Sequence, residues 1–143
     1  LGDTSRQLPI RKISKQILNV RQGNETLAMI GIRKPSLHFY SRQIVYYEYS
    51  NEEGLINLFE RFQFDKRNNY QDIPDYDSET FLVVIDEYSS REEHWLNINY
   101  QKLGQYGIYK LWRVKRSDLN NYAKYLSNNG VESTWRNKKV EKF

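Results

Sequence analysis

A short, unbroken apolar run near the middle of the chain constrains the fold more than any other feature of this 143-residue sequence. The run is Phe81-Leu82-Val83-Val84-Ile85, which is far shorter than the roughly 20 apolar residues that span a bilayer. It has the length of a β-strand, and it lacks the alternation of a strand with one wet face. We therefore predict a central strand over residues 80–88, covered on both of its faces.

The residues around this strand show both helical and extended patterns. Apolar residues recur at helical spacing in three segments, which predicts helices over residues 9–21, over residues 51–63 behind a Ser50–Glu53 capping box, and from a Ser117 cap to a stop at Gly130. Segments rich in β-branched and aromatic residues predict further strands, over residues 25–33, 37–49, 94–100 and 107–115. Residues 65–79 are polar and are expected to form an exposed loop.

The order of these elements decides the fold class. The helices do not alternate with the strands as they do in a doubly wound sheet, so we predict an α+β fold: a mainly antiparallel sheet of about five strands, packed by two or three helices. The length suits one domain over residues 1–143. Within it, the basic residues 131–143 are expected to form a frayed tail.

Charge is segregated along the chain. Residues 1–47 carry 8 basic and 2 acidic side chains, residues 48–93 carry 4 and 13, and residues 94–143 carry 10 and 3. In the last third, basic residues alternate with aromatic ones in the segment 106–116 (YGIYKLWRVKR). Such cations can pair with phosphates, and such rings can stack on unpaired bases.

We therefore predict a set of nucleic-acid-binding residues in the first helix, the last strand and the last helix. They are Arg11, Lys12, Lys15, Tyr106, Tyr109, Lys110, Arg113, Lys115, Arg116 and Lys124. Two structural arguments oppose this hypothesis. A strand presents only alternate residues on one face, and an acidic middle that folds against the basic ends would neutralise them.

Enzymatic chemistry finds little support in the residues. There is no cysteine, which excludes a thiolate nucleophile and a cysteine zinc site. The segment 81–87 (FLVVIDE) resembles the Walker B strand of P-loop ATPases, but the sequence lacks the glycine-rich loop that would hold the phosphates. The only histidines are His38 and His94, and no Ser-His-Asp pattern is visible. We expect no catalytic residue, no metal and no cofactor.

One nuclease resemblance needs separate treatment. Pro74-Asp75, followed by an apolar strand, is similar to the PD-(D/E)xK metal-dependent nucleases, whose carboxylates gather Mg²⁺. That family requires an acid two residues before a lysine on the next strand. The local candidate, Tyr100-Gln101-Lys102, lacks the acid.

The sequence thus predicts a non-enzymatic nucleic-acid-binding accessory protein in the cytoplasm. Asn, Ile, Lys and Tyr make up 47 residues, which favours a low-GC genome and a phage or mobile element as the source. Two alternatives stay open: a protein-interaction module that meets an oppositely charged protein surface, as an inhibitor or assembly subunit, and a metal-dependent nuclease. No membrane partner is expected.

Overall fold

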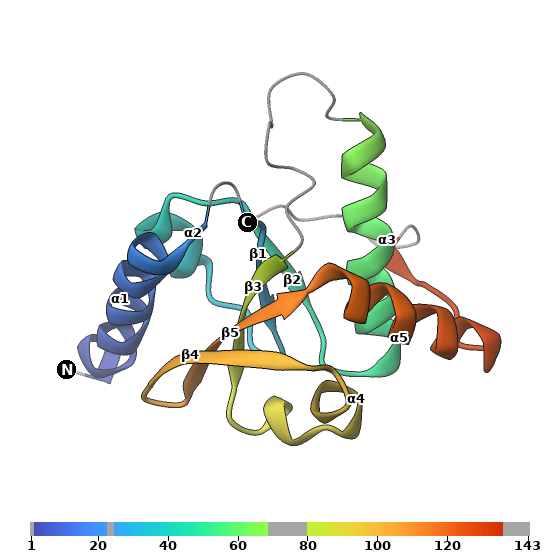
Figure 1. The fold of residues 1–143 in the computed structure, drawn as a ribbon. Helices are drawn as coiled ribbons and strands as arrows, with labels where there is room; N and C mark the ends of the chain where they lie inside the picture. The colour runs from blue at the N-terminus through green and yellow to red at the C-terminus, as the bar shows by residue number, and fades with distance from the viewer. Residues whose placement is uncertain (1, 23–24, 69–79, 136–143) are drawn as a thin grey trace.

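A five-stranded mixed sheet forms the middle layer of the protein (Figure 1). The computed structural model describes residues 2–22, 25–68 and 80–135. The strands lie in the order β2-β1-β3-β5-β4, with bounds β1 Leu27–Ile30, β2 Val45–Glu48, β3 Thr80–Asp86, β4 Tyr100–Tyr106 and β5 Tyr109–Lys115. Strand β1 pairs in parallel with β2 and β3, whereas the longer β3–β5 and β4–β5 pairs are antiparallel. The predicted α+β class, with a mostly antiparallel sheet, is confirmed.

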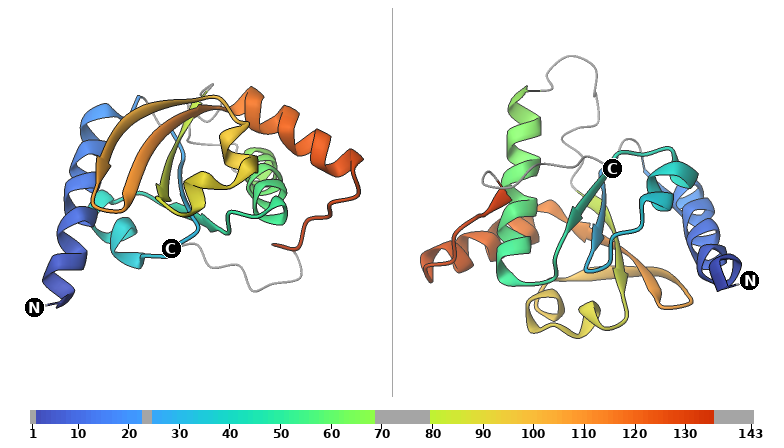
Figure 2. Two further views of the ribbon diagram at one scale, coloured as in Figure 1. Left: turned by 90° about the horizontal axis from the view of Figure 1, so that it is seen from below. Right: turned by 180° about the vertical axis from the view of Figure 1, so that it is seen from behind.

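Helices cover both faces of this sheet (Figure 2). Helices α1 (Gly2–Val20) and α2 (Pro35–Ser41) pack on one face. Helices α3 (Glu52–Asn68), α4 (Glu93–Leu96) and α5 (Arg116–Asn128) pack on the other, and a short 3₁₀ turn, η1 (Ser89–Arg91), leads into α4. The two apolar layers are therefore separated by the sheet itself.

Strand β3 is central and buried on both faces, as its apolar run predicted. Phe81, Val83 and Ile85 belong to the core beneath α3 and α5. Leu82 and Val84 point the other way, into the core beneath α1 and α2. Because successive side chains of a strand alternate between its faces, both layers need apolar residues from this one strand.

The predicted strand over residues 37–49 is wrong in its first half. Residues 35–41 form helix α2 instead, and only residues 45–48 are extended. Pro35 occupies the first turn of α2, where its fixed φ suits a helix and its missing N–H is not needed. Arg42 adopts the left-handed conformation, with φ of 58°, and ends the helix before β2 begins.

The predicted strand over residues 94–100 is also wrong. Residues 93–96 form the single turn of α4, and β4 starts only at Tyr100. Trp95 is fully buried, and Ile98 is nearly so. These two side chains attach the turn and the residues after it to the core beneath α5, which extended pairing would not achieve.

The first helix, predicted over residues 9–21, starts earlier, at Gly2, and ends at Val20. Other boundaries moved by smaller amounts. The cap of α3 is Asn51 rather than Ser50, because Oδ1 of Asn51 accepts the amide of Gly54 at 2.8 Å. Helix α5 starts at Arg116, one residue before the predicted Ser117 cap. Strand β1 ends at Ile30, because the next residue, Gly31, has φ of +91°.

Two other predictions fall partly outside the described residues. Of the predicted loop 65–79, residues up to Asn68 belong to α3 and residues 69–79 are not described. Of the predicted tail, residues 131–135 are described, and Asn57 of α3 accepts the backbone amides of Thr134 and Trp135 at 2.8 and 3.1 Å. Residues 136–143 lie outside the described range.

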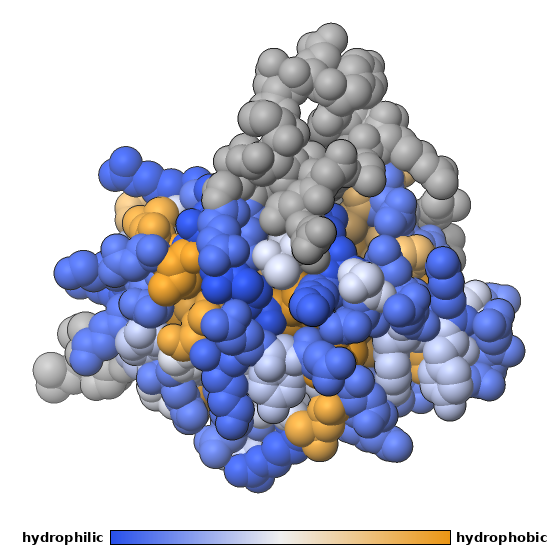
Figure 3. All heavy atoms as spheres, viewed as in Figure 1, coloured by the Kyte–Doolittle hydropathy of each residue, from blue (hydrophilic) through white to orange (hydrophobic). Residues whose placement is uncertain are grey.

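The described surface is mainly hydrophilic on the face that Figure 3 displays, and its apolar residues lie in small separate groups. Among the described helices, none combines the length and the apolar character that crossing a membrane requires.

Candidate functional site

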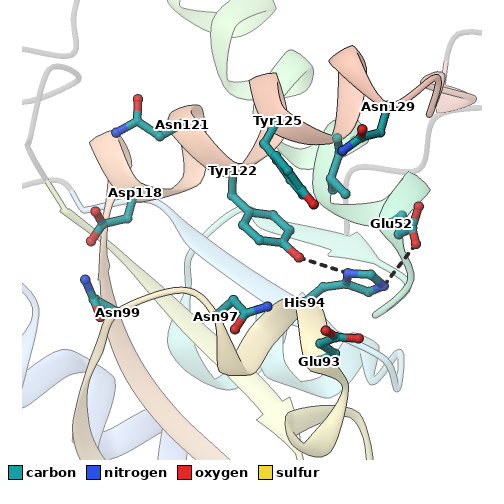
Figure 4. A pocket seen from close by; sticks show the side chains of 11 residues that line it. Glu52, Glu93, His94, Asn97, Asn99, Asp118, Asn121, Tyr122, Tyr125 and Asn129 are labelled. Atoms are coloured by element: carbon teal, nitrogen blue, oxygen red, sulfur yellow. Dashed lines mark hydrogen bonds and ion pairs between the residues drawn. The ribbon is translucent and has the colours of Figure 1, made fainter.

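A polar cavity of about 600 Å³ opens between α4 and α5 (Figure 4). Its volume lies within the range of small-molecule sites, about 300–1,000 Å³. Eleven residues from α3, α4, the α4–β4 connection and α5 line it, namely Glu52, Glu93, His94, Asn97, Asn99, Asp118, Asn121, Tyr122, Tyr125, Leu126 and Asn129. We call this cavity the α4–α5 pocket.

Helix α5 forms one wall of the pocket because its two faces differ in chemistry. Leu119, Ala123 and Leu126 are buried and hold the helix on the sheet. The other face carries the polar pocket residues of this helix at positions i, i+3, i+4 and i+7 from Asp118, and the C-cap residue Asn129 continues the row at i+11. Residues at this spacing share one side of an α-helix, so they project together into the cavity.

The opposite wall is the turn of α4 and the residues that follow it. Trp95 and Ile98 are buried, whereas the polar side chains beside them in the sequence line the cavity. His94, Asn97 and Asn99 therefore reach the pocket from this wall (Figure 4). The burial of Trp95 and Ile98 therefore fixes the position of these polar groups.

His94 is held by partners on both of its ring nitrogens. Nε2 lies 3.3 Å from Oε1 of Glu52, and Nδ1 lies 3.1 Å from the hydroxyl oxygen of Tyr122. A carboxylate can only accept a hydrogen bond, so Nε2 is the donor in its contact with Glu52. The chain Tyr122–His94–Glu52 holds the imidazole and the phenol in fixed orientations at the pocket.

Two tyrosines of α5 give the polar pocket an aromatic wall. The rings of Tyr122 and Tyr125 lie 5.7 Å apart with an angle of 48° between their planes. Tyr125 is 59% exposed, so most of its ring is available to a ligand. A tyrosine ring combines an apolar face with a polar tip, which suits a ligand that has both.

The charge of the pocket is negative. Glu52, Glu93 and Asp118 line it, and neither lysine nor arginine does within the part of the chain that the structure describes. Four asparagine amides add both donors and acceptors. Among the described residues, no group of three or more histidine and acidic side chains is placed to hold a metal ion. The arrangement can hydrogen-bond a polar ligand from several sides.

The residues predicted to bind nucleic acid do not share one surface. Arg11, Lys12 and Lys15 are exposed on α1, where Nε of Arg11 donates to the hydroxyl of Tyr40 at 3.1 Å. On β5, Tyr109 is buried beneath α1, and Tyr106 at the end of β4 packs against the same core. The alternation of side chains in β5 sends Lys110 to the opposite face of the sheet.

Arg113 takes part in a buried ion pair instead of facing solvent. Its Nε and Nη2 donate to the carboxylate of Glu25 at 2.9 and 3.0 Å, and Nη2 also donates to the carbonyl of Val20 at 2.6 Å. Burial alone raises the pKa of the Glu25 carboxyl. The hydrogen bonds from Arg113, Thr80 and the Gln22 amide outweigh that effect and lower this pKa below its ordinary value.

The remaining predicted residues lie elsewhere again. Arg116 donates to Oγ1 of Thr26 at 2.7 Å, and its guanidinium stands 4.9 Å from the centre of the Phe62 ring. Lys115 is exposed at the end of β5. Lys124 lines a separate groove between α3 and α5.

Two acidic or basic groups considered in the sequence also have structural partners. Asp86, at the end of β3, is 3% exposed, and its Oδ2 accepts the amide of Ser89 at 3.1 Å. This bond holds the turn that leads into η1. His38, on α2, places Nδ1 2.6 Å from the carbonyl oxygen of Gln43. Both groups therefore stabilise local chain reversals.

The sequence reasoning missed most of the α4–α5 pocket, although one signal was present. The last helix was predicted from its apolar face alone. On the opposite face, polar residues recur at helical spacing, namely Asp118, Asn121, Tyr125 and Asn129. Amide and acid groups repeated along one helix face are a readable sign of a polar surface. What the sequence could not provide is the opposing wall from α4.

Comparison with known proteins gives one family. A family model described as "Cyanobacterial RgtA-type glycosyltransferase, C-terminal domain" matches residues 20–130. The matched segment starts at the last residue of α1 and contains all five strands and every residue that lines the pocket. No curated protein and no solved structure matches the chain significantly.

This match overturns the predicted function. The nucleic-acid-binding role and the phage or mobile-element origin are wrong, because the matching family is a glycosyltransferase domain described as cyanobacterial. The family supports neither of the two alternatives, the interaction module and the nuclease. Asp75, on which the nuclease resemblance depended, lies outside the described residues.

Proposed function

Because the chain belongs to the family of cyanobacterial RgtA-type glycosyltransferase C-terminal domains, we propose that it binds the carbohydrate part of a glycosyltransferase substrate in the α4–α5 pocket. The observation that carries this proposal is the lining of the cavity. Amide, carboxylate and phenol groups surround about 600 Å³ of space within the matched segment.

The chemistry of a sugar fits this lining. Each sugar hydroxyl both donates and accepts a hydrogen bond, and asparagine amides offer both roles side by side. The C–H face of a sugar ring is apolar and flat, so it can lie on an exposed aromatic ring such as Tyr125. A lipid chain would instead leave the carboxylates and amides of this pocket unpaired.

The geometry favours binding over acid–base chemistry for the one imidazole of the pocket. Both ring nitrogens of His94 already have partners, at 3.1 and 3.3 Å. A general base must have a nitrogen within hydrogen-bond reach of the proton that it removes. We therefore assign His94 a positioning role: it fixes the direction of the Tyr122 hydroxyl.

The test is an NMR titration of the ¹⁵N-labelled protein with methyl glucoside, methyl galactoside and methyl N-acetylglucosaminide. We expect at least one of these probes to shift the amide signals of residues 93–99 and 118–129. Loss of two neutral hydrogen bonds, each contributing about 0.5–1.5 kcal/mol, should weaken binding about tenfold in the Asn97→Ala, Asn121→Ala double variant.

The matched control is Asn128→Ala, because Asn128 is exposed on α5 and does not line the pocket. This variant should bind as tightly as the wild type. The proposal fails if no glycoside shifts these signals. It also fails if the control loses as much affinity as the double variant.

A further inference from the structure

The carboxylates of the α4–α5 pocket come from three different elements. Glu52 begins α3, Glu93 begins α4, and Asp118 lies in the first turn of α5. In Figure 4, Glu52 and Glu93 lie near His94, and Asp118 lies beside Asn99 at the other end of the cavity. A ligand in the pocket therefore meets negative charge at both ends.

Two of these carboxylates have no side-chain partner among the described residues. Glu52 interacts with His94 at 3.3 Å. Within residues 2–22, 25–68 and 80–135, neither Glu93 nor Asp118 has a salt bridge or a side-chain hydrogen bond, and no lysine or arginine lines the cavity. Their charge is therefore available to a ligand.

The hydrogen-bond roles in the pocket point the same way as the charge. The carboxylates of the pocket can only accept hydrogen bonds. A protonated amine brings three donors and a positive charge. A phosphate or a carboxylate brings only acceptors, and it would meet like charge in a partly enclosed cavity.

We infer that the α4–α5 pocket selects its sugar by charge: it takes a sugar that bears a protonated amine in preference to the neutral sugar, and it disfavours uronic acids and sugar phosphates. This inference rests on the proposed function, that the pocket binds carbohydrate. Glu93 and Asp118 are its specificity-determining residues.

The test compares three probes that share one ring: methyl glucosaminide, methyl glucoside and methyl glucuronide. In NMR titrations at pH 7 and low salt, we expect the amine to bind about three- to tenfold tighter than the neutral glycoside. This range corresponds to one or two partly exposed ion contacts. The glucuronide should bind most weakly, and 0.5 M NaCl should narrow all of these differences.

Two double variants localise the effect. Glu93→Gln with Asp118→Asn should abolish the preference for the amine, so that this variant binds the amine and the neutral glycoside with affinities within about twofold of each other. Glu53→Gln with Glu92→Gln makes the same change in net charge at exposed positions that do not line the pocket, and it should keep the preference.

The possible results separate the two proposals. If no glycoside binds, the carbohydrate-binding function fails and the charge inference falls with it. If the glycosides bind but the amine has no advantage, or the glucuronide binds best, the inference is overturned and the proposed function stands. Loss of the preference in the Glu53, Glu92 control would also overturn the inference, since the selection would then come from the overall charge of the protein.

Discussion

The change Glu25→Gln should destabilise the fold more than any surface substitution of equal size. Glu25 is fully buried, and the side chain of Arg113 that it pairs with is only 10% exposed. The change leaves the guanidinium buried without a counter-charge. Removing one partner of a buried ion pair typically costs about 3–5 kcal/mol. Because glutamine can still accept from Thr80 and from the Gln22 amide, we expect a value near the lower end, about 3 kcal/mol.

Urea denaturation measures this loss directly. The buried Trp95 and Trp112 provide a fluorescence signal of unfolding. With a denaturant slope of about 2 kcal/mol/M, a loss of about 3 kcal/mol lowers the midpoint by about 1.5 M. The slope itself should not change if unfolding stays two-state.

Two further variants show whether the lost charge is the cause. Glu87 and Arg91 form an exposed ion pair at 3.2 Å, with side chains 39% and 68% exposed, so Glu87→Gln should cost less than about 1 kcal/mol. The apolar pair Glu25→Leu with Arg113→Met should recover most of the lost stability, since no unpaired charge is left in the interior. The reasoning is refuted if Glu25→Gln costs no more than the Glu87→Gln control.

Three other outcomes follow from the fold. Because folding lowers the pKa of Glu25, the contribution of this residue to stability is complete at pH 7 and is lost as pH falls below about 4. Urea titrations at pH 7 and at a pH below about 4 should show that acid lowers the free energy of unfolding of Glu25→Gln less than that of the wild type. Gly31 and Gly130 both have φ of +91°, but a Cβ at Gly31 would overlap the side chains of Ser89 and Asp86, whereas Gly130 faces open space. Gly31→Ala should therefore cost about 1–3 kcal/mol more than Gly130→Ala in the same denaturation assay, and equal losses would contradict the close contact. Val84→Ala should cost about 1–3 kcal/mol, and hydrogen exchange should find the β3 amides among the slowest; fast exchange there would exclude a central strand.

Elements whose pattern lies within one segment of the sequence could be predicted, whereas elements that depend on packing against distant residues could not. Helices α3 and α5 and strand β3 could be predicted, because each displays its periodicity, or its unbroken apolar character, within its own segment. The segment 37–49 could not be predicted as a whole. Its β-branched and aromatic residues favour a strand along its full length, and only the packed structure shows that Pro35 starts a helix and that Arg42 ends it.

The functional site was harder to predict from the sequence than the fold. The basic pattern around Arg113 was real, but its partner, Glu25, lies 88 residues away in the chain. No local pattern indicates that a cation is already paired at such a separation. The same holds for the α4–α5 pocket, whose lining residues are spread along the sequence from Glu52 to Asn129.

The sequence by itself determined that β3 must be covered on both faces, since an unbroken apolar strand leaves no side that water could solvate. It also determined the polar face of α5, through the spacing of Asp118, Asn121 and Asn129. Only the tertiary structure decided what those features do. Burial of Trp95 brings the α4 turn against α5 and closes the pocket, and burial of Arg113 beside Glu25 removes from the surface a charge that the sequence had assigned to nucleic acid. The physical reason is that hydrogen bonds and charges act over a few ångströms of space, whatever number of residues separates their partners along the chain.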